Sequence, residues 1–149
     1  MRALWWLGWV LTGCWASPSG TTPGLDVSAG QAVYFQACSQ CHQTNGQGLS
    51  GAFPPLAGSR WPVGAPDVPI RIVLHGLRGE IRVQGQRYNN VMVAHKDTLT
   101  DQQIADVVTY IRNAWGNRAS VVTPSAVAAV RAAHADRTTP WTAEELKPR

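Results

Sequence analysis

Two cysteines and a histidine occur together in the run Cys38-Ser39-Gln40-Cys41-His42. Two thiols at this spacing can add to the two vinyl groups of a haem, and the imidazole that follows is then held next to the iron. A zinc site would need a second pair of ligands, and no cysteine follows Cys41. A redox-active dithiol would need a preceding β-strand, whereas the residues before Cys38 have a helical pattern, and a disulfide across two residues would be strained. The run therefore predicts one covalently bound haem c, with His42 as an iron ligand.

The iron needs a second ligand on its other face, and the candidates are Met92, His75, His95, His134 and Lys96. Met92 is the only methionine apart from Met1, and it ends the irregular stretch Tyr88-Asn89-Asn90-Val91-Met92, which does not suit a methionine that only fills a helix core. His95 is the main alternative, because it lies in the same loop. A His/His pair would lower the reduction potential relative to a His/Met pair. We expect Met92 to be the ligand.

The elements that must position these residues are short helices and one hairpin. In chain order we expect a helix over 28–40, a Gly- and Pro-rich loop over 43–66, a helix over 68–77, a hairpin over 80–88, a helix over 101–115, an Ala-rich helix over 124–135, and a last fragment capped by Thr142 with Glu145. The hairpin should turn at Gly85-Gln86, with glycine first in the turn. Ser28 and Asp67 suit the caps of the first two helices. Thr100 and Gln103 form a capping box for 101–115.

The composition limits what the chain can be. It has 149 residues, of which 44% are hydrophobic and 15% charged, enough for one ordinary globular core. It contains no run of about 18 apolar residues, so we expect no membrane-spanning helix, which excludes transporters and channels. The net charge is +4, and its cations are spread over residues 60–149 without a block of like charge. This pattern does not fit a nucleic-acid-binding surface.

The first residues have the pattern of an export signal. Arg2 precedes an apolar, Trp-rich stretch over 3–10. Leu11-Thr12-Gly13-Cys14 resembles the bacterial lipoprotein cleavage box, in which the cysteine becomes the acylated first residue. Residues 18–24 are rich in Pro, Gly, Ser and Thr, which favours a flexible tether.

These patterns predict a location. We expect a lipoprotein-type signal peptide over 1–13, and a lipidated Cys14 with a flexible tether over 14–27. Acyl chains on Cys14 would anchor the protein at the periplasmic side of a membrane. Cleavage after Ala16, which loosely fits the small-residue pattern, would instead give a soluble periplasmic protein.

Several motifs agree with one known protein family. They are Gly30 and Tyr34, the run 38–42, Phe53-Pro54-Pro55-Leu56-Ala57-Gly58, Met92 and Tyr110-Ile111. Together they resemble a class I cytochrome c over residues 28–117. Within that class, Gly46-Gln47-Gly48, Tyr88-Asn89-Asn90-Val91-Met92 and Trp115-Gly116 are similar to bacterial cytochromes that donate electrons to haem-copper terminal oxidases, including the ba3 type.

The resemblance implies a mostly α-helical class I cytochrome c fold, with three to five helices around one covalent haem and a small β-hairpin. The cytochrome domain would span 28–117. A helical C-terminal extension over 118–149 would pack on that domain, and the sequence assigns it no function.

The resemblance also implies roles for single residues. The carbonyl of Pro54 would accept the Nδ1 hydrogen of His42 and so fix the imidazole. Leu56 and Val91 would wall the haem and keep water from the iron. Met92 would be the second ligand. His75 has no assigned role, and we expect it on the surface of its helix.

With both axial positions filled, such a protein has no open site for oxygen or peroxide, so we expect an electron carrier and not an enzyme. Its partners would be membrane respiratory complexes, a terminal oxidase and a quinol-cytochrome c reductase. Two alternatives stay open. The chain could be the haem subunit of a periplasmic dehydrogenase or nitrite reductase, or a peroxidase-like haem enzyme with a labile second ligand.

Overall fold

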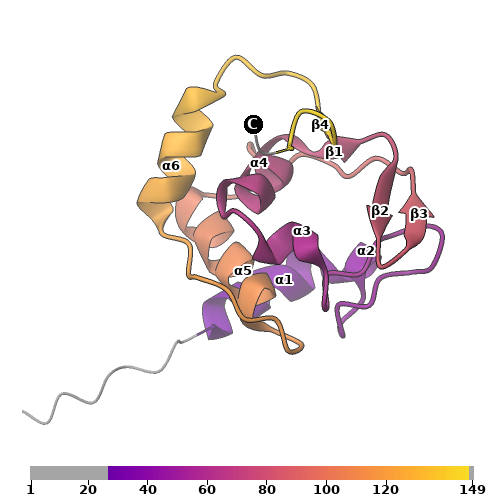
Figure 1. Ribbon diagram of the computed structural model, residues 1–149. Helices are drawn as coiled ribbons and strands as arrows, with labels where there is room; N and C mark the ends of the chain where they lie inside the picture. Colours follow the sequence, from indigo (N-terminus) through magenta and orange to yellow (C-terminus); the bar gives the residue numbers. More distant parts are fainter. Residues whose placement is uncertain (1–26, 148–149) are drawn as a thin grey trace, which may run out of the picture.

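Six helices and four short strands make up the part of the chain that the computed structural model describes, residues 27–147 (Figure 1). They are α1 (Ser28–Ala37), α2 (Ser39–His42), α3 (Arg60–Val63), α4 (Asp67–His75), β1 (Leu77–Arg78), β2 (Ile81–Val83), β3 (Gln86–Tyr88), α5 (Asp101–Asn113), α6 (Pro124–Ala133) and β4 (Trp141–Thr142). The expected signal peptide, Cys14 and most of the tether lie outside the described residues. The mostly α-helical class is confirmed. Between residues 27 and 147, no helix is long and apolar enough to cross a bilayer.

Helices α1 and α5 cross closely and form the base of the fold. A Cβ built on Gly30 would lie 2.1 Å from the Asp106 carbonyl oxygen, so only glycine allows this approach. Next to the crossing, the Tyr34 ring packs on Tyr110 and Trp115, with ring centroids 5.4 and 5.0 Å apart. The helix that precedes the cysteine run, α1, is therefore fixed to α5, the helix near the end of the domain.

Helix α5 begins as the sequence predicts. Thr100 and Gln103 form the capping box, and the buried stripe lies on one side of the helix. The stripe consists of Ile104, Val107, Val108 and Ile111. The helix ends at Asn113, two residues before the expected end, because Ala114 has an extended backbone with ψ of 161°, and Trp115 and Gly116 after it are left-handed, with φ of 52° and 85°.

Two other helix boundaries differ from expectation. The expected helix over 28–40 divides at Cys38, which ends α1 and precedes the short α2. Ser28 is the first residue of α1, and Val27 occupies the cap position. Asp67 likewise lies inside the first turn of α4, where it pairs with Arg71 at 2.6 Å.

The remaining differences concern turns. Gly76 ends α4 before the expected Leu77 because its φ is +80°. The hairpin turns at Gln84 and Gly85, one residue earlier than expected, because both have left-handed φ values of 50° and 82°, as a type I′ turn requires. The expected loop over 43–66 contains the short helix α3, which Ser59 caps through its hydroxyl.

The C-terminal extension, residues 118–147 as the structure describes them, wraps around the helices of residues 28–117 (Figure 1). Helix α6 packs on α5 and α4, and β4 pairs in parallel with β1. The backbone amide of Thr142 and its hydroxyl bond to the Glu145 carboxylate, but the residues form a turn and not the expected helical fragment.

The expectation that His75 lies on a helix surface is wrong. Its side chain is only 4% exposed, because the extension returns over α4 and covers it. Its ring centroid lies 6.3 Å from both the His134 and Trp141 rings. Neither contact is visible in the local pattern of α4.

Candidate haem site

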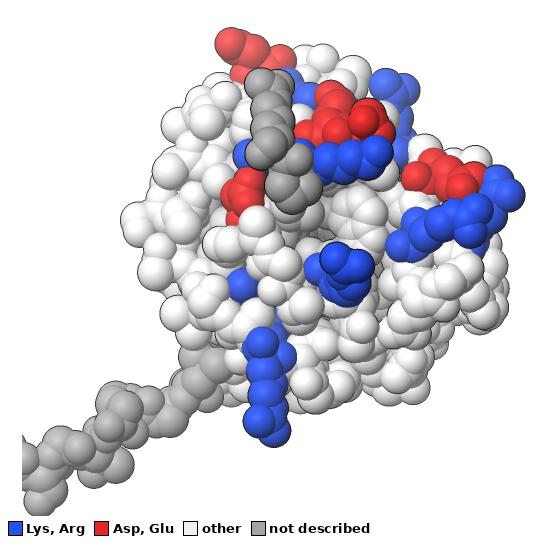
Figure 2. Space-filling view, viewed as in Figure 1, with Lys and Arg blue, Asp and Glu red and all other residues white. Residues whose placement is uncertain are grey.

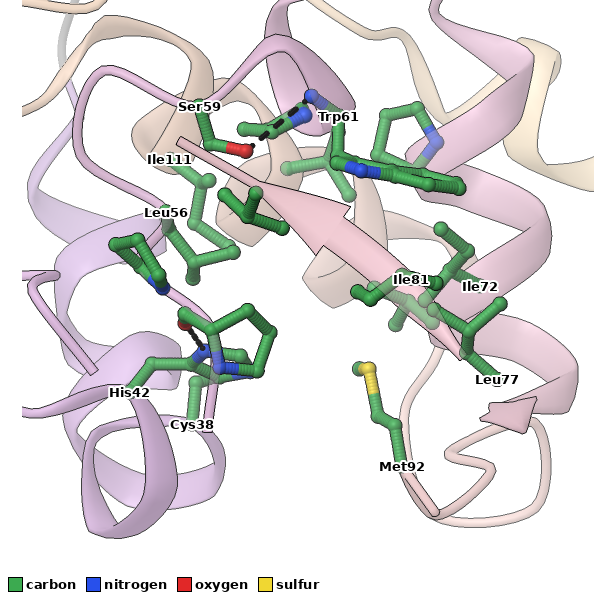
Figure 3. A pocket seen from close by; sticks show the side chains of 17 residues that line it. Cys38, His42, Leu56, Ser59, Trp61, Ile72, Leu77, Ile81, Met92 and Ile111 are labelled. Carbon is green, nitrogen blue, oxygen red and sulfur yellow. Dashed lines mark hydrogen bonds between the residues drawn. The ribbon is translucent and has the colours of Figure 1, made fainter. Parts of the chain in front are cut away.

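A slot opens between the cysteine run and the hairpin (Figure 3). It consists of an inner hollow of about 680 Å³ and an outer hollow of about 750 Å³. Both hollows are lined by Cys38, His42, Pro54, Leu77, Ile81 and Met92. Both volumes include space that is open to solvent.

Helix α2 delivers His42 to one wall of the slot. Its Nδ1 donates a hydrogen bond to the Pro54 carbonyl over 2.9 Å, which leaves Nε2 with its lone pair free to bind a metal. Burial lowers the pKa of His42, and the bond to Pro54 opposes this shift only in part. The imidazole is therefore neutral at pH 7, the form in which histidine binds iron.

The two cysteines lie at one edge of the slot and do not bond to each other. Cys38 is half-buried and touches both hollows, whereas Cys41 is exposed and touches only the outer one. Burial, followed by the neighbouring Cys41, raises the pKa of the Cys38 thiol to about 11. Both thiols thus face the space in which a covalently bound group would lie.

Met92 enters the slot from the wall opposite His42, with its sulfur directed into the gap (Figure 3). Two backbone hydrogen bonds hold Met92 to Leu77, one donated by each amide, over 2.8 and 3.2 Å. An imidazole nitrogen and a thioether sulfur on opposite walls are a donor pair suited to haem iron. The slot therefore fits a haem.

Apolar side chains form most of the inner hollow. Its walls include Leu56, Trp61, Ile72, Val73, Val108 and Ile111. The polar groups there are already bonded within the protein, since the Ser59 hydroxyl accepts from the Trp61 amide and the Trp61 indole nitrogen donates to the Arg82 carbonyl. Such a lining disfavours water beside the iron.

The predicted site residues and candidate ligands do not all line the slot. Leu56 lines the inner hollow, while Val91 is 64% exposed and lies at the rim of the outer one, where it covers only the edge. Among the other candidate ligands, His95 also lines the outer hollow and is half-buried. His75, His134 and Lys96 line neither hollow.

Trp61 and Ile81 line the inner hollow and were missed by the sequence reasoning. Trp61 lies in the Gly- and Pro-rich loop, where a large aromatic residue next to Pro62 was a signal for a buried contact. Ile81 follows the alternation of the hairpin, whose inner face points to the slot.

Comparisons with known proteins agree with this geometry. The cytochrome c family model matches residues 27–115. Over 96 residues the chain is 44% identical to cytochrome c-552 of Thermus thermophilus, covering 62% of this chain and 72% of that protein. A second cytochrome c-552, from a named strain of Thermus thermophilus, is also 44% identical, with 64% of its length covered.

Dehydrogenase subunits also match. The gluconate 2-dehydrogenase cytochrome c subunit of Pantoea cypripedii is 42% identical over 113 residues, which are 72% of this chain and 25% of that subunit. The chain thus spans about a quarter of the length of that relative. Because the family match extends over more than half of its residues, the chain belongs to the cytochrome c family, and it is a monohaem class I cytochrome c that binds haem c covalently and carries electrons.

Proposed function

We propose that this cytochrome carries single electrons to a membrane-bound terminal oxidase, with haem bonded to Cys38 and Cys41 and held between His42 and Met92. The observation that carries the proposal is that the imidazole and the thioether enter one apolar slot from opposite walls. Two protein ligands in these positions leave no place for a substrate at the iron.

The haem supplies an iron that gains and loses one electron. The chain's own residues keep its surroundings constant during that change. The Pro54 carbonyl fixes the orientation of the His42 ring, and the backbone of Leu77 holds the backbone of Met92. Because both ligands are held through backbone groups, little rearrangement accompanies electron transfer.

The outer hollow offers a contact for a partner. Val91 and Val93 at its rim are 64% and 65% exposed, and the exposed Cys41 lines the same hollow. None of the residues that line this hollow is Lys, Arg, Asp or Glu. Figure 2 shows one face of the molecule, on which cations and anions are interspersed. An apolar rim favours a partner with a matching apolar patch and an association that salt changes only mildly.

The similarity to bacterial oxidase-feeding cytochromes supports a terminal oxidase as the acceptor. A second candidate, the haem subunit of a dehydrogenase, is favoured by the 113-residue match to the gluconate dehydrogenase subunit, which is longer than the match to cytochrome c-552.

Stopped-flow mixing of the reduced protein with a purified ba3-type oxidase separates the two. Oxidation at a rate set by encounter, with little change between low and high salt, supports the carrier. Failure to reduce the oxidase, together with co-purification of a large dehydrogenase, supports the second candidate. Fast carbon monoxide binding with peroxide turnover would contradict both.

We further propose that the protein is lipid-anchored at the periplasmic side of a membrane. The support is the run Leu11-Thr12-Gly13-Cys14 after an apolar stretch, in the part of the chain outside the described residues. An anchor would keep the carrier near its membrane-bound partners.

A further inference from the structure

The loop over 91–99 carries Met92, and of its apolar residues only Met92 and Leu99 pack against the buried clusters. Val91, Val93 and Ala94 are exposed. Within the loop, the amides of Thr98 and Leu99 bond only to the His95 carbonyl, which forms a local turn. Other parts of the molecule must therefore fix where Met92 lies.

One fixing point is a backbone ladder that ends in the C-terminal extension. The Met92 amide donates to the Leu77 carbonyl, and the Leu77 amide donates to the Met92 carbonyl. Leu77 pairs on its other side with Trp141, in the parallel pairing of β1 with β4, and the Trp141 amide donates to the Gly76 carbonyl over 3.0 Å. The backbone partner of Met92 is thus itself held by the extension.

Side chains of the extension support the same wall of the slot. Trp141 and Leu146 are buried in one cluster with Leu77 and Ile81, which line both hollows. Met92 packs against this cluster and also against the main core. The extension therefore contributes to the packing behind the Met92 sulfur.

A second fixing point is Arg131 on α6. Its guanidinium donates to the carbonyls of Lys96 and Leu99, over 2.6 and 3.1 Å, and to the Asp101 carboxylate over 2.8 Å. One planar group thus joins both ends of the turn after Met92 to the start of α5. Neighbouring amides at His95 and Lys96 donate to the carbonyls of Val73 and Leu74 on α4.

From these contacts we infer that the C-terminal extension clamps the loop over 91–99 and so keeps Met92 in the haem slot. Arg131 and Trp141 are positioning residues, acting through the Lys96 and Leu99 carbonyls and through Leu77. The inference rests on the proposed ligation by Met92. An external ligand can reach the iron only when the loop opens, so its apparent affinity measures how often the clamp releases.

The test uses imidazole as the external ligand and the haem-containing oxidised protein, followed through the far-red Met-to-iron charge-transfer band. Arg131→Met removes both carbonyl contacts, and we expect it to raise the apparent imidazole affinity about tenfold, equivalent to about 1.4 kcal/mol in the opening equilibrium. Hydrogen exchange at the Met92, His95 and Lys96 amides should accelerate by about the same factor.

Arg118→Met is the control. Arg118 also lies in the extension, but it is exposed, and none of the hydrogen bonds among the described residues joins its side chain to the loop over 91–99. We expect its imidazole affinity to stay within about twofold of wild type. An equal rise in both variants would overturn a role for the Arg131 contacts.

Arg131→Lys keeps the charge but cannot span both carbonyls, and we expect a rise of about threefold. If Arg131→Met does not fold, the imidazole affinity and the hydrogen exchange of Arg131→Lys test the inference instead. Unchanged affinity and unchanged exchange in a protein that has the far-red band would overturn the clamp alone. A wild-type protein without the band would overturn the ligation by Met92, and the positioning role with it.

Discussion

Arg112 on α5 connects the last long helix to the loop that lines the inner hollow. Its side chain is only 2% exposed. The guanidinium donates to the carbonyls of Pro62, Gly64 and Ser120 over 2.5, 3.0 and 2.7 Å, and to the Ser120 hydroxyl over 2.9 Å. All four acceptors are uncharged, so the positive charge is stabilised by dipoles alone.

Replacing Arg112 with methionine keeps most of the apolar stem but removes every one of these donors. A hydrogen bond from a charged group contributes about 1.5–3 kcal/mol, while the buried charge itself costs several kcal/mol to desolvate. The carbonyls of Pro62 and Gly64 would lose their donor. Setting the lost bonds against the relieved desolvation, we expect Arg112→Met to lower the free energy of unfolding by about 3 kcal/mol.

Equilibrium unfolding of the haem-containing protein in guanidinium chloride measures this change, through a lower midpoint at an unchanged slope. Arg118→Met is the control, because Arg118 is exposed, and we expect a change within about 0.5 kcal/mol. A loss below about 1 kcal/mol for Arg112→Met would show that water replaces the guanidinium and that Arg112 does not hold the loop.

Two further predictions concern pH and the N-terminal segment. Burial, followed by the positive charges of Lys96, His134 and Arg137, lowers the pKa of His75 below its unfolded value, so the unfolded chain takes up protons first. The free energy of unfolding should therefore fall as pH falls through about 6.5, and fall less in His75→Phe; urea titrations at pH 7.5 and 5.0 that give the same loss of unfolding free energy in the wild type and in His75→Phe would refute this. Labelled fatty acid should be incorporated into the wild type and not into Cys14→Ser, which should be released as a soluble protein; an unmodified mature terminus by mass spectrometry would contradict lipidation.

Local patterns in the sequence were sufficient for the elements that nearby residues determine. The capping box of Thr100 and Gln103 and the apolar stripe of α5 depend on residues a few positions apart, and both occur as predicted. The run 38–42 predicted the covalent haem c that the family match supports.

Features that depend on long-range contacts could not be predicted in this way. Pairing of Trp141 with Leu77 joins residues far apart in the chain, and it is this return of the extension that buries His75. The fork of Arg131 across the Lys96 and Leu99 carbonyls also has no local signature. The turn shift at the hairpin has another cause, since a type I′ turn accepts the non-glycine residue Gln84 in a left-handed conformation.

We propose that His42 and Met92 hold the haem iron of this one-electron carrier. The most direct measurement is the far-red absorption spectrum of the oxidised protein, wild type beside Met92→Ala, at neutral pH. We predict the weak Met-to-iron charge-transfer band in the wild type and its complete loss in the variant, with a lower reduction potential. A wild-type spectrum without the band, or a band that survives in Met92→Ala, would contradict ligation of the iron by Met92.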